Sequence, residues 1–256
     1  MTNCSIYQFN AELKGYKPRM WRRFQVSEDI SLARLAYIVM TLFEMRANHL
    51  FDFEFKMELN KSKLIKELGR ENIEIPRKFL LNIIKIGLPD SETNELDKRI
   101  YDFNIFDVKM KHFITPMMPK TRFTYDFGDD WKINVKLEKI IIDETLSKKD
   151  LPRVLKGKGY GIIEDCGGID GLKSIAEAYS EKSGEEYENY CEWLLDDDID
   201  LASFDIVDMN NRLKNIPRIY EKIYDSRYGS VSVCHDAGRL RQDRCAGDNC
   251  TGKHNS

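Results

Sequence analysis

Two pairs of neighbouring acidic residues are the groups in this sequence most capable of chemistry. Asp129 and Asp130 lie in a predicted turn, and Glu164 and Asp165 precede a double glycine. Together with Asp126 they could bind a hard cation such as Mg²⁺, which prefers oxygen ligands, if the fold brings both loops to one end of a sheet. The simpler alternative is structural, because Asp side chains in turns accept hydrogen bonds from nearby backbone N–H groups.

Three further side chains could belong to a functional rim. Trp21 and Arg22 offer a stacking ring and a guanidinium for phosphate or carboxylate, but neighbours in a strand face opposite sides and cannot form one platform. The simpler expectation is a buried Trp21 beside a solvated or ion-paired Arg22. His49 could be a metal ligand or a base, although a lone histidine at the start of a strand more often makes a structural hydrogen bond.

The C-terminal cysteines offer a second kind of metal ligand. Cys234, Cys245, Cys250 and His254 could coordinate zinc, but they lack the Cys-x-x-Cys spacing that makes such sites specific. The glycines within 157–161 fit neither the P-loop pattern nor the dinucleotide-binding pattern. We therefore predict no cofactor. Because no catalytic constellation is recognisable, the sequence leaves enzymatic activity undecided.

The bulk composition excludes several classes of protein. Forty basic and forty-three acidic side chains give 256 residues a net charge of −3, which is not the electrostatic signature of a non-specific nucleic-acid binder. No apolar run approaches the roughly 20 residues that span a bilayer. We expect a cytoplasmic protein with no membrane partner, because no secretory signal is apparent and the six cysteines are too dispersed for a disulfide framework.

The first acidic pair must be positioned by the strands that flank it. Apolar residues occupy every second position on both sides of its turn, which predicts a β-hairpin over residues 121–138. These residues are Phe123, Tyr125, Phe127, Trp131, Ile133, Val135 and Leu137.

Similar patterns predict the other elements. Alternation indicates strands over 7–13, 21–26 and 51–59, with a shorter strand over 151–155. Ser31 is the expected N-cap of a helix that buries Leu32, Leu35, Val39 and Leu42. Further helices are expected over 171–179, 185–195 and 206–224. The side chains that these last two helices should bury include Tyr187, Tyr190, Cys191, Leu194, Val207, Leu213, Ile216 and Tyr220.

We expect one main domain over residues 1–224. Between about 60 and 119 the pattern becomes Lys-rich, with helical pieces over 62–68 and 77–86, and we interpret this interval as an insertion between two strands. Residues 225–256 lose almost all periodicity and are expected to form a poorly ordered tail.

Four separated segments carry a family resemblance. They are residues 13–23, 49–53, 125–131 and 164–168, and in this order and spacing the chain resembles the plasmid pRiA4b ORF-3-like family. The resemblance implies an α+β domain in which a mixed, largely antiparallel sheet wraps around a helix, with additional C-terminal helices. It also implies an association with plasmids or insertion elements. Members often have histidine where this chain has Ile133, and Cys-Pro-Pro at 161–163, so a mechanism that uses either is not expected here.

Three functions are compatible with these observations. The first is an intracellular interaction module that presents a sheet edge or loop rim to a macromolecular partner. The second is a metal-dependent enzyme that acts on phosphodiesters through Asp126, Asp129, Asp130, Glu164 and Asp165. The third is a DNA-associated recombination accessory protein, suggested by the resemblance and by basic pieces such as residues 61–70, although the net negative charge argues against nucleic acid.

Overall fold

The structure, a computed structural model, describes residues 5–56, 83–88, 101–143, 146–216 and 224. Eight strands form one sheet in the order β5-β4-β3-β6-β7-β1-β2-β8. All neighbouring strands are antiparallel except β4 and β5, so the protein is an α+β protein with a mixed, largely antiparallel sheet. The strands are β1 (Ser5–Leu13), β2 (Trp21–Ser27), β3 (Phe51–Lys56), β4 (Ile83–Gly87), β5 (Phe103–Asn104), β6 (Lys120–Tyr125), β7 (Trp131–Ile142) and β8 (Arg153–Lys158).

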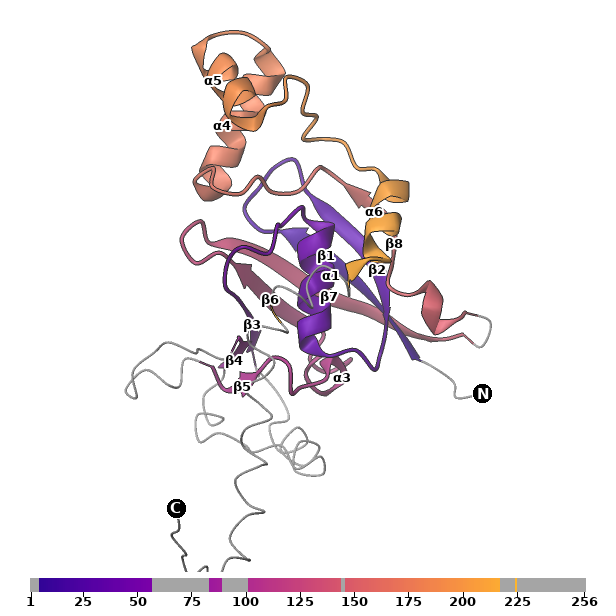
Figure 1. The fold of residues 1–256 in the computed structure, drawn as a ribbon. Coiled ribbons are helices and arrows are strands. Elements are labelled where there is room, and N and C mark those ends of the chain that lie inside the picture. The colour runs from indigo at the N-terminus through magenta and orange to yellow at the C-terminus, as the bar shows by residue number, and fades with distance from the viewer. Residues whose placement is uncertain (1–4, 57–82, 89–100, 144–145, 217–223, 225–256) are drawn as a thin grey trace, which may run out of the picture.

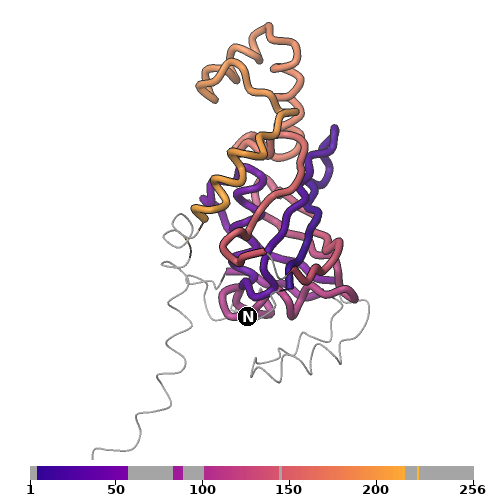
Figure 2. The backbone as a smooth tube through the Cα atoms, turned by 90° about the vertical axis from the view of Figure 1, so that its right-hand side faces the viewer, coloured from indigo at the N-terminus to yellow at the C-terminus, as the bar shows by residue number. Residues whose placement is uncertain are grey.

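Helix α1 lies across one face of this sheet, and α6 lies beside β8 and β2 (Figure 1). Helices α4 and α5 project from the sheet at the end opposite α3 (Figures 1 and 2). In the described residues, no helix is both long enough and apolar enough to cross a membrane. The helices are α1 (Leu32–Leu42), α3 (Met110–Phe113), the 3-10 turn η2 (Lys148–Asp150), α4 (Gly168–Glu181), α5 (Glu185–Leu194) and α6 (Ile206–Leu213).

Helix α1 is the centre of the core and begins where the sequence predicted. The hydroxyl of Ser31 accepts a hydrogen bond from the backbone N–H of Arg34 at 3.1 Å, which caps the helix. Every residue of the helix except Arg34 is buried. A helix that is apolar around nearly its whole circumference is stable only inside a core, and the curved sheet supplies that environment.

The predicted hairpin is confirmed as β6 and β7. Trp131 and Ile133 are fully buried, as are Phe123 and Tyr125, which pair with them across the two strands. The expectation that Phe127 continues the buried row is wrong. Strand β6 ends at Tyr125, so Phe127 lies in the turn and is half exposed.

The Lys-rich interval contributes directly to the sheet. Residues 83–86, expected at the end of a helical piece, instead belong to β4, where Ile84 and Ile86 are fully buried and Lys85 is exposed. This period of two places both isoleucines on the core face opposite Phe55 and Phe53 of β3. The helical piece over 62–68 and the tail over 225–256 lie outside the described residues.

The C-terminal helices differ in detail from the sequence prediction. Helix α6 ends at Leu213, and Val207 is largely exposed although we expected it to be buried. Leu213 and Ile216 are fully buried, as expected. The side chains of α5 that we expected to be buried are only partly so, because this helix packs mainly on α4 and away from the sheet.

Candidate functional site: three loops around His49

Three loops meet where β3 begins and β6 ends. Phe51 pairs with Tyr125 across these antiparallel strands, so the residues just before β3 lie beside those just after β6. The backbone N–H of Asp126 donates to the carbonyl oxygen of Leu50 at 3.0 Å, which continues the pairing by one step. His49 and Asp126 are therefore neighbours because of strand register. The third loop, between β8 and α4, brings Asp165.

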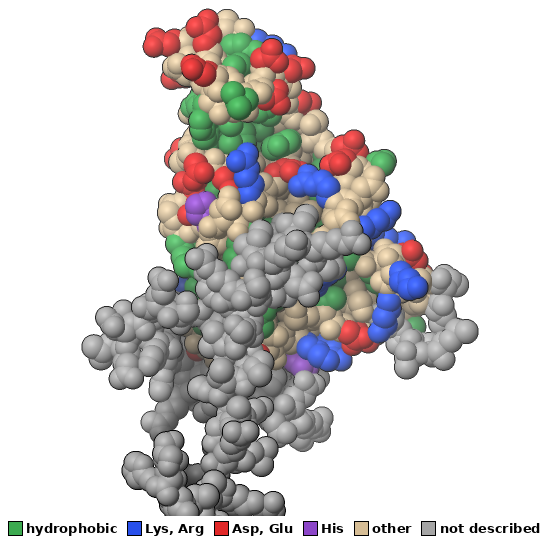
Figure 3. Space-filling view, viewed as in Figure 1, with side chains coloured by type: hydrophobic (Ala, Val, Ile, Leu, Met, Phe, Trp, Pro, Cys, Tyr) green, Lys and Arg blue, Asp and Glu red, His purple; other side chains and the backbone are tan. Residues whose placement is uncertain are grey.

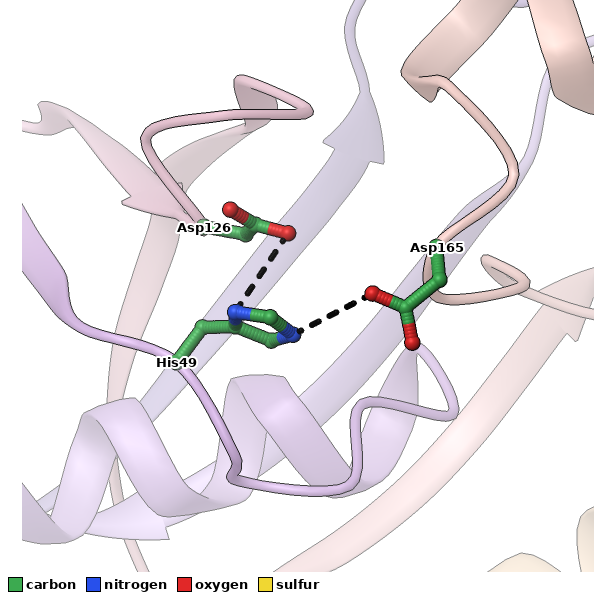
Figure 4. Close-up of side chains that lie close together, drawn as sticks. All are labelled: His49, Asp126 and Asp165. Carbon is green, nitrogen blue, oxygen red and sulfur yellow. Dashed lines mark ion pairs between the residues drawn. The ribbon is translucent and has the colours of Figure 1, made fainter.

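His49 lies between two carboxylates (Figure 4). Its Nδ1 is 3.5 Å from Oδ2 of Asp126, and its Nε2 is 3.8 Å from Oδ1 of Asp165. The side chains are 13% exposed for Asp126, 29% for His49 and 73% for Asp165, so the site opens to solvent on the Asp165 side. The imidazole also meets the ring of Tyr125 edge-on, with ring centroids 5.6 Å apart. These contacts hold the imidazole with a carboxylate facing each nitrogen.

Asp126 combines the turn role and the site role that the sequence left as alternatives. Its Oδ1 accepts a hydrogen bond from the backbone N–H of Gly128 at 2.9 Å, which is the expected turn interaction. Its Oδ2 faces His49. Asp126 and Asp165 both have left-handed backbone, at φ 55° and 62°, a conformation that costs free energy for residues other than glycine. The surrounding contacts must therefore hold both residues in place.

Glu164 does not belong to the exposed cluster. It is buried, and its Oε1 accepts hydrogen bonds from the backbone N–H of Arg46 and from the hydroxyl of Tyr125, each at 2.6 Å. The Tyr125 hydroxyl in turn accepts from the backbone N–H of Asn48 at 3.0 Å. Burial, followed by the adjacent carboxylate, raises the pKa of Tyr125. Glu164 thus anchors the loop that carries His49.

The two residues of the first acidic pair, Asp129 and Asp130, contact different parts of the protein. Asp130 pairs with Lys132. The backbone of Asp129 lies against Gly168 at the end of the third loop. A Cβ atom added at Gly168 would be only 2.6 Å from the carbonyl oxygen of Asp129. Its Oδ2 is shielded from solvent and has no hydrogen-bond partner among the described residues.

Burial, and then the nearby Asp129 carboxylate, raise the pKa of the Cys166 thiol to about 11, so this cysteine is not an activated nucleophile.

Arg22 is a structural residue in the core and lies away from the rim. The expectation of a buried Trp21 beside a solvated or ion-paired Arg22 is wrong, because Arg22 is fully buried and bonded to backbone carbonyl oxygens, while Trp21 is only partly buried. Burial lowers the pKa of Arg22 to about 10, against the opposing effect of Glu44. The guanidinium lies over the ring of Phe204 at 3.9 Å. It donates five hydrogen bonds to the carbonyl oxygens of Leu42 (2.9 Å), Trp21 (3.0 Å), Lys158 (2.8 Å), Gly159 (2.7 Å) and Tyr160 (2.6 Å).

The residues around His49 fit a divalent metal ion. One atom each from His49, Asp126 and Asp165 can be chosen so that all three lie within 4.8 Å of one another. Ligands about 2.1 Å from a shared ion lie at most about 4.2 Å apart, so the ligand atoms must come closer to share an ion, and Asp165 is the most exposed of the three. One imidazole with two carboxylates suits Zn²⁺, Mn²⁺ or Fe²⁺ better than Mg²⁺, which takes oxygen ligands. The zinc candidates Cys234, Cys245, Cys250 and His254 lie outside the described residues.

Comparison with known proteins agrees with this architecture. The model of the plasmid pRiA4b ORF-3-like family matches residues 5–210. The chain belongs to this family. It is 23% identical over 216 residues to the uncharacterized protein y4hQ of Sinorhizobium fredii, covering 83% of this chain and 92% of that protein. It is also similar to the crystal structure of a protein of unknown function, MM3350, from Methanosarcina mazei Go1, with a TM-score of 0.61 and 27% identity over 81% of this chain and 98% of the other.

Three of the sequence candidates meet in this pRiA4b ORF-3-like protein, and the sequence analysis missed two residues that contact the site. Tyr125 was interpreted only as a core residue, although its hydroxyl connects Glu164 to the His49 loop. Tyr224, whose hydroxyl donates to the carbonyl oxygen of His49 at 2.7 Å, comes from a distant part of the chain. The register of the predicted β3 and β6 could have indicated the neighbourhood of His49 and Asp126. No local pattern could have indicated Tyr224.

Proposed function

We propose that the protein binds a divalent transition-metal ion through His49, Asp126 and Asp165 and uses it to hydrolyse phosphodiesters. The observation that supports this proposal is that one ligand atom each from His49, Asp126 and Asp165 can be chosen so that all three lie within 4.8 Å of one another. A bound divalent ion lowers the pKa of a coordinated water and polarises a phosphoryl oxygen, which are the two requirements of this reaction.

The surrounding residues position His49 and Asp126 and leave one side of the site open to solvent. Asp126 is held by Gly128, and the His49 loop is held by Tyr125 and Glu164, so these two ligands are positioned before an ion arrives. The exposed Asp165 leaves one side open for substrate. Arg46, exposed on the same loop, is the cation that we assign to the substrate phosphate.

Thermal melting with Mn²⁺, Zn²⁺, Ni²⁺ or Mg²⁺ added separately tests the metal site. We expect Mn²⁺ or Zn²⁺ to raise the melting temperature of the wild type, and His49→Ala and Asp126→Asn to abolish the rise. Asp130→Asn is the matched control, since Asp130 pairs with Lys132 and should leave the rise intact. Equal shifts in His49→Ala and wild type would disprove the site.

Activity is tested separately with bis(p-nitrophenyl) phosphate. We expect metal-dependent release of nitrophenolate by the wild type and by Asp130→Asn, with loss in His49→Ala. A metal-induced thermal shift without any turnover would retain the metal site and reject the phosphodiesterase activity. Turnover that persists in a chelator would reject the metal-dependent mechanism.

A second candidate function is an intracellular interaction module with a macromolecular partner. It is favoured by the α4–α5 part of the chain, which projects from the sheet (Figure 2). Two large apolar side chains of this part, Trp193 and Leu195, are exposed. The cytoplasmic setting is supported by the sequence alone, and a mobile-element association by the family's name, which refers to a plasmid. Fractionation of cells and inspection of neighbouring genes test these two points.

A further inference from the structure

The negative charge of this protein is concentrated in one projecting part. Residues 168–200, comprising α4, α5 and the segment that follows, are here called the acidic hairpin. They contain eleven acidic and two basic residues, a net charge of −9, whereas the whole chain has −3 and the remainder therefore has +6. Figure 3 shows acidic side chains clustered over this projection, with apolar side chains between them. Net charge is thus distributed very unevenly along the sequence.

Few of these carboxylates are neutralised. Both lysines of the acidic hairpin form ion pairs within it, Lys173 with Asp170 and Lys182 with Asp198. The other nine acidic residues have no cationic partner within the described ranges. Acidic residues in the first turn of α5 are stabilised by the helix dipole, but Glu192 near its C-terminus is not. Repulsion among these groups lowers stability, and a bound cationic surface would relieve it.

Two large apolar side chains protrude through this acidic surface. Trp193 is 46% exposed and Leu195 is 90% exposed. Leu195 is also the C-cap of α5 with φ 54°, a left-handed conformation in which glycine or asparagine is preferred. Neither burial nor backbone geometry explains a leucine at this position. A hydrophobic contact with a partner would explain it.

Hydrogen bonds hold the backbone of the acidic surface beyond Leu195. The hydroxyl of Tyr179 donates to the carbonyl oxygen of Asp196, and the hydroxyl of Tyr187 donates to that of Asp197 at 2.8 Å. The backbone N–H of Asp198 donates to Oδ1 of Asp196 at 3.0 Å. The tyrosines thus fix the backbone while the aspartate side chains remain exposed. Such preorganisation reduces the entropic cost of binding.

We propose that the acidic hairpin docks a basic polypeptide segment that carries a large apolar side chain. Charge complementarity selects a cationic occupant, and Trp193 and Leu195 supply the hydrophobic anchors between the charges. Polyanions and anionic membranes are repelled by the same surface. This inference rests on the interaction-module candidate and is independent of the metal site around His49.

Fluorescence anisotropy with three labelled peptides tests the proposal. The first alternates lysine with leucine, the second replaces each leucine by serine, and the third replaces each lysine by serine. We expect the lysine–leucine peptide to bind most tightly, with an affinity that falls as salt rises from about 50 to about 300 mM. The combined Trp193→Ala and Leu195→Ala variant should lose about tenfold or more in affinity. Val207→Ala, which removes an exposed apolar side chain elsewhere, should bind like the wild type.

Charge is tested by Asp196→Asn combined with Asp197→Asn. We expect weaker binding and a shallower salt dependence, whereas the matched pair Asp150→Asn and Asp208→Asn, exposed outside the acidic hairpin, should have little effect. His49→Ala should bind normally, which separates this site from the metal site. Preferential binding of the lysine-free peptide would show that the partner is not basic. It would still be compatible with an interaction module. No peptide binding, or a wild-type dimer that Trp193→Ala dissociates, would overturn the inference.

Discussion

The hydroxyl of Tyr125 donates to Oε1 of Glu164 at 2.6 Å, joining residues 39 positions apart in the sequence. The same carboxylate oxygen accepts the backbone N–H of Arg46, so one buried group connects β6, the loop before β3 and the loop after β8. The two acidic segments identified in the sequence therefore meet through a buried tyrosine, and His49 lies beside this connection.

Tyr125→Phe should lower the free energy of unfolding by about 1–3 kcal/mol. The substitution removes the hydroxyl that serves Glu164 and Asn48 and leaves a buried carboxylate with one donor fewer. Urea denaturation followed by circular dichroism measures the change. Tyr16→Phe is the control, because Tyr16 is also buried but its hydroxyl has no hydrogen-bond partner in the described part of the chain. Equal losses in both variants would contradict the role assigned to Tyr125.

Arg22→Lys should destabilise the protein by about 3 kcal/mol or more. A lysine cannot reproduce the planar donor set that serves five carbonyl oxygens, and it leaves several of them without a partner. The matched control is Arg23→Lys on the same strand. Arg23 is 38% exposed and pairs with Glu138, so its replacement should cost at most about 1 kcal/mol. Equilibrium unfolding of the two variants that shows similar stabilities would refute the assignment.

Cys166 should react slowly with iodoacetamide at neutral pH and faster as the pH approaches 11. Its pKa is raised to about 11, and only the thiolate reacts. The folded protein holds the thiol proton of Cys166 more tightly than the unfolded chain does, so the protonated thiol favours the folded state. The stabilising contribution is present below pH 9 and is lost as the pH rises from 9 through about 11.

Asp129→Asn should lower the pKa of Cys166 and move the alkylation profile to lower pH, since the Asp129 carboxylate is the second cause of the shift. Mass spectrometry of the alkylated protein measures the profile. Asp170→Asn provides the comparison, because Asp170 pairs with Lys173. An unchanged profile in Asp129→Asn would show that the Asp129 carboxylate does not contribute to this pKa shift.

Leu195→Gly should raise the free energy of unfolding by up to about 1 kcal/mol. Glycine adopts the left-handed conformation without strain, and an exposed leucine contributes little by burial. Trp193→Gly, two residues earlier and inside α5, should have the opposite sign, because glycine in a helix interior costs about 1 kcal/mol. Thermal unfolding distinguishes the two, and destabilisation by Leu195→Gly would show that Leu195 makes contacts that stabilise the free protein.

Local patterns in the sequence were sufficient for most elements. Alternation of apolar residues located β1, β2, β3 and the β6–β7 hairpin, because a strand places successive side chains on opposite faces whatever surrounds it. The capping oxygen of Ser31 located the start of α1 for an equally local reason. These features depend on residues within a few positions of one another, so they could be predicted from the sequence.

The tertiary structure decided which face of each strand is inside and which distant residues meet. Alternation placed Trp21 and Arg22 on opposite faces of the strand. It could not show that the guanidinium of Arg22 bonds to five carbonyl oxygens, because these belong to three separate parts of the chain. The contacts of His49 with Asp126 and Asp165 depend on strand register and on the path of the loop after β8. Such contacts are set by packing of the whole sheet around α1, and short-range sequence patterns carry no information about them.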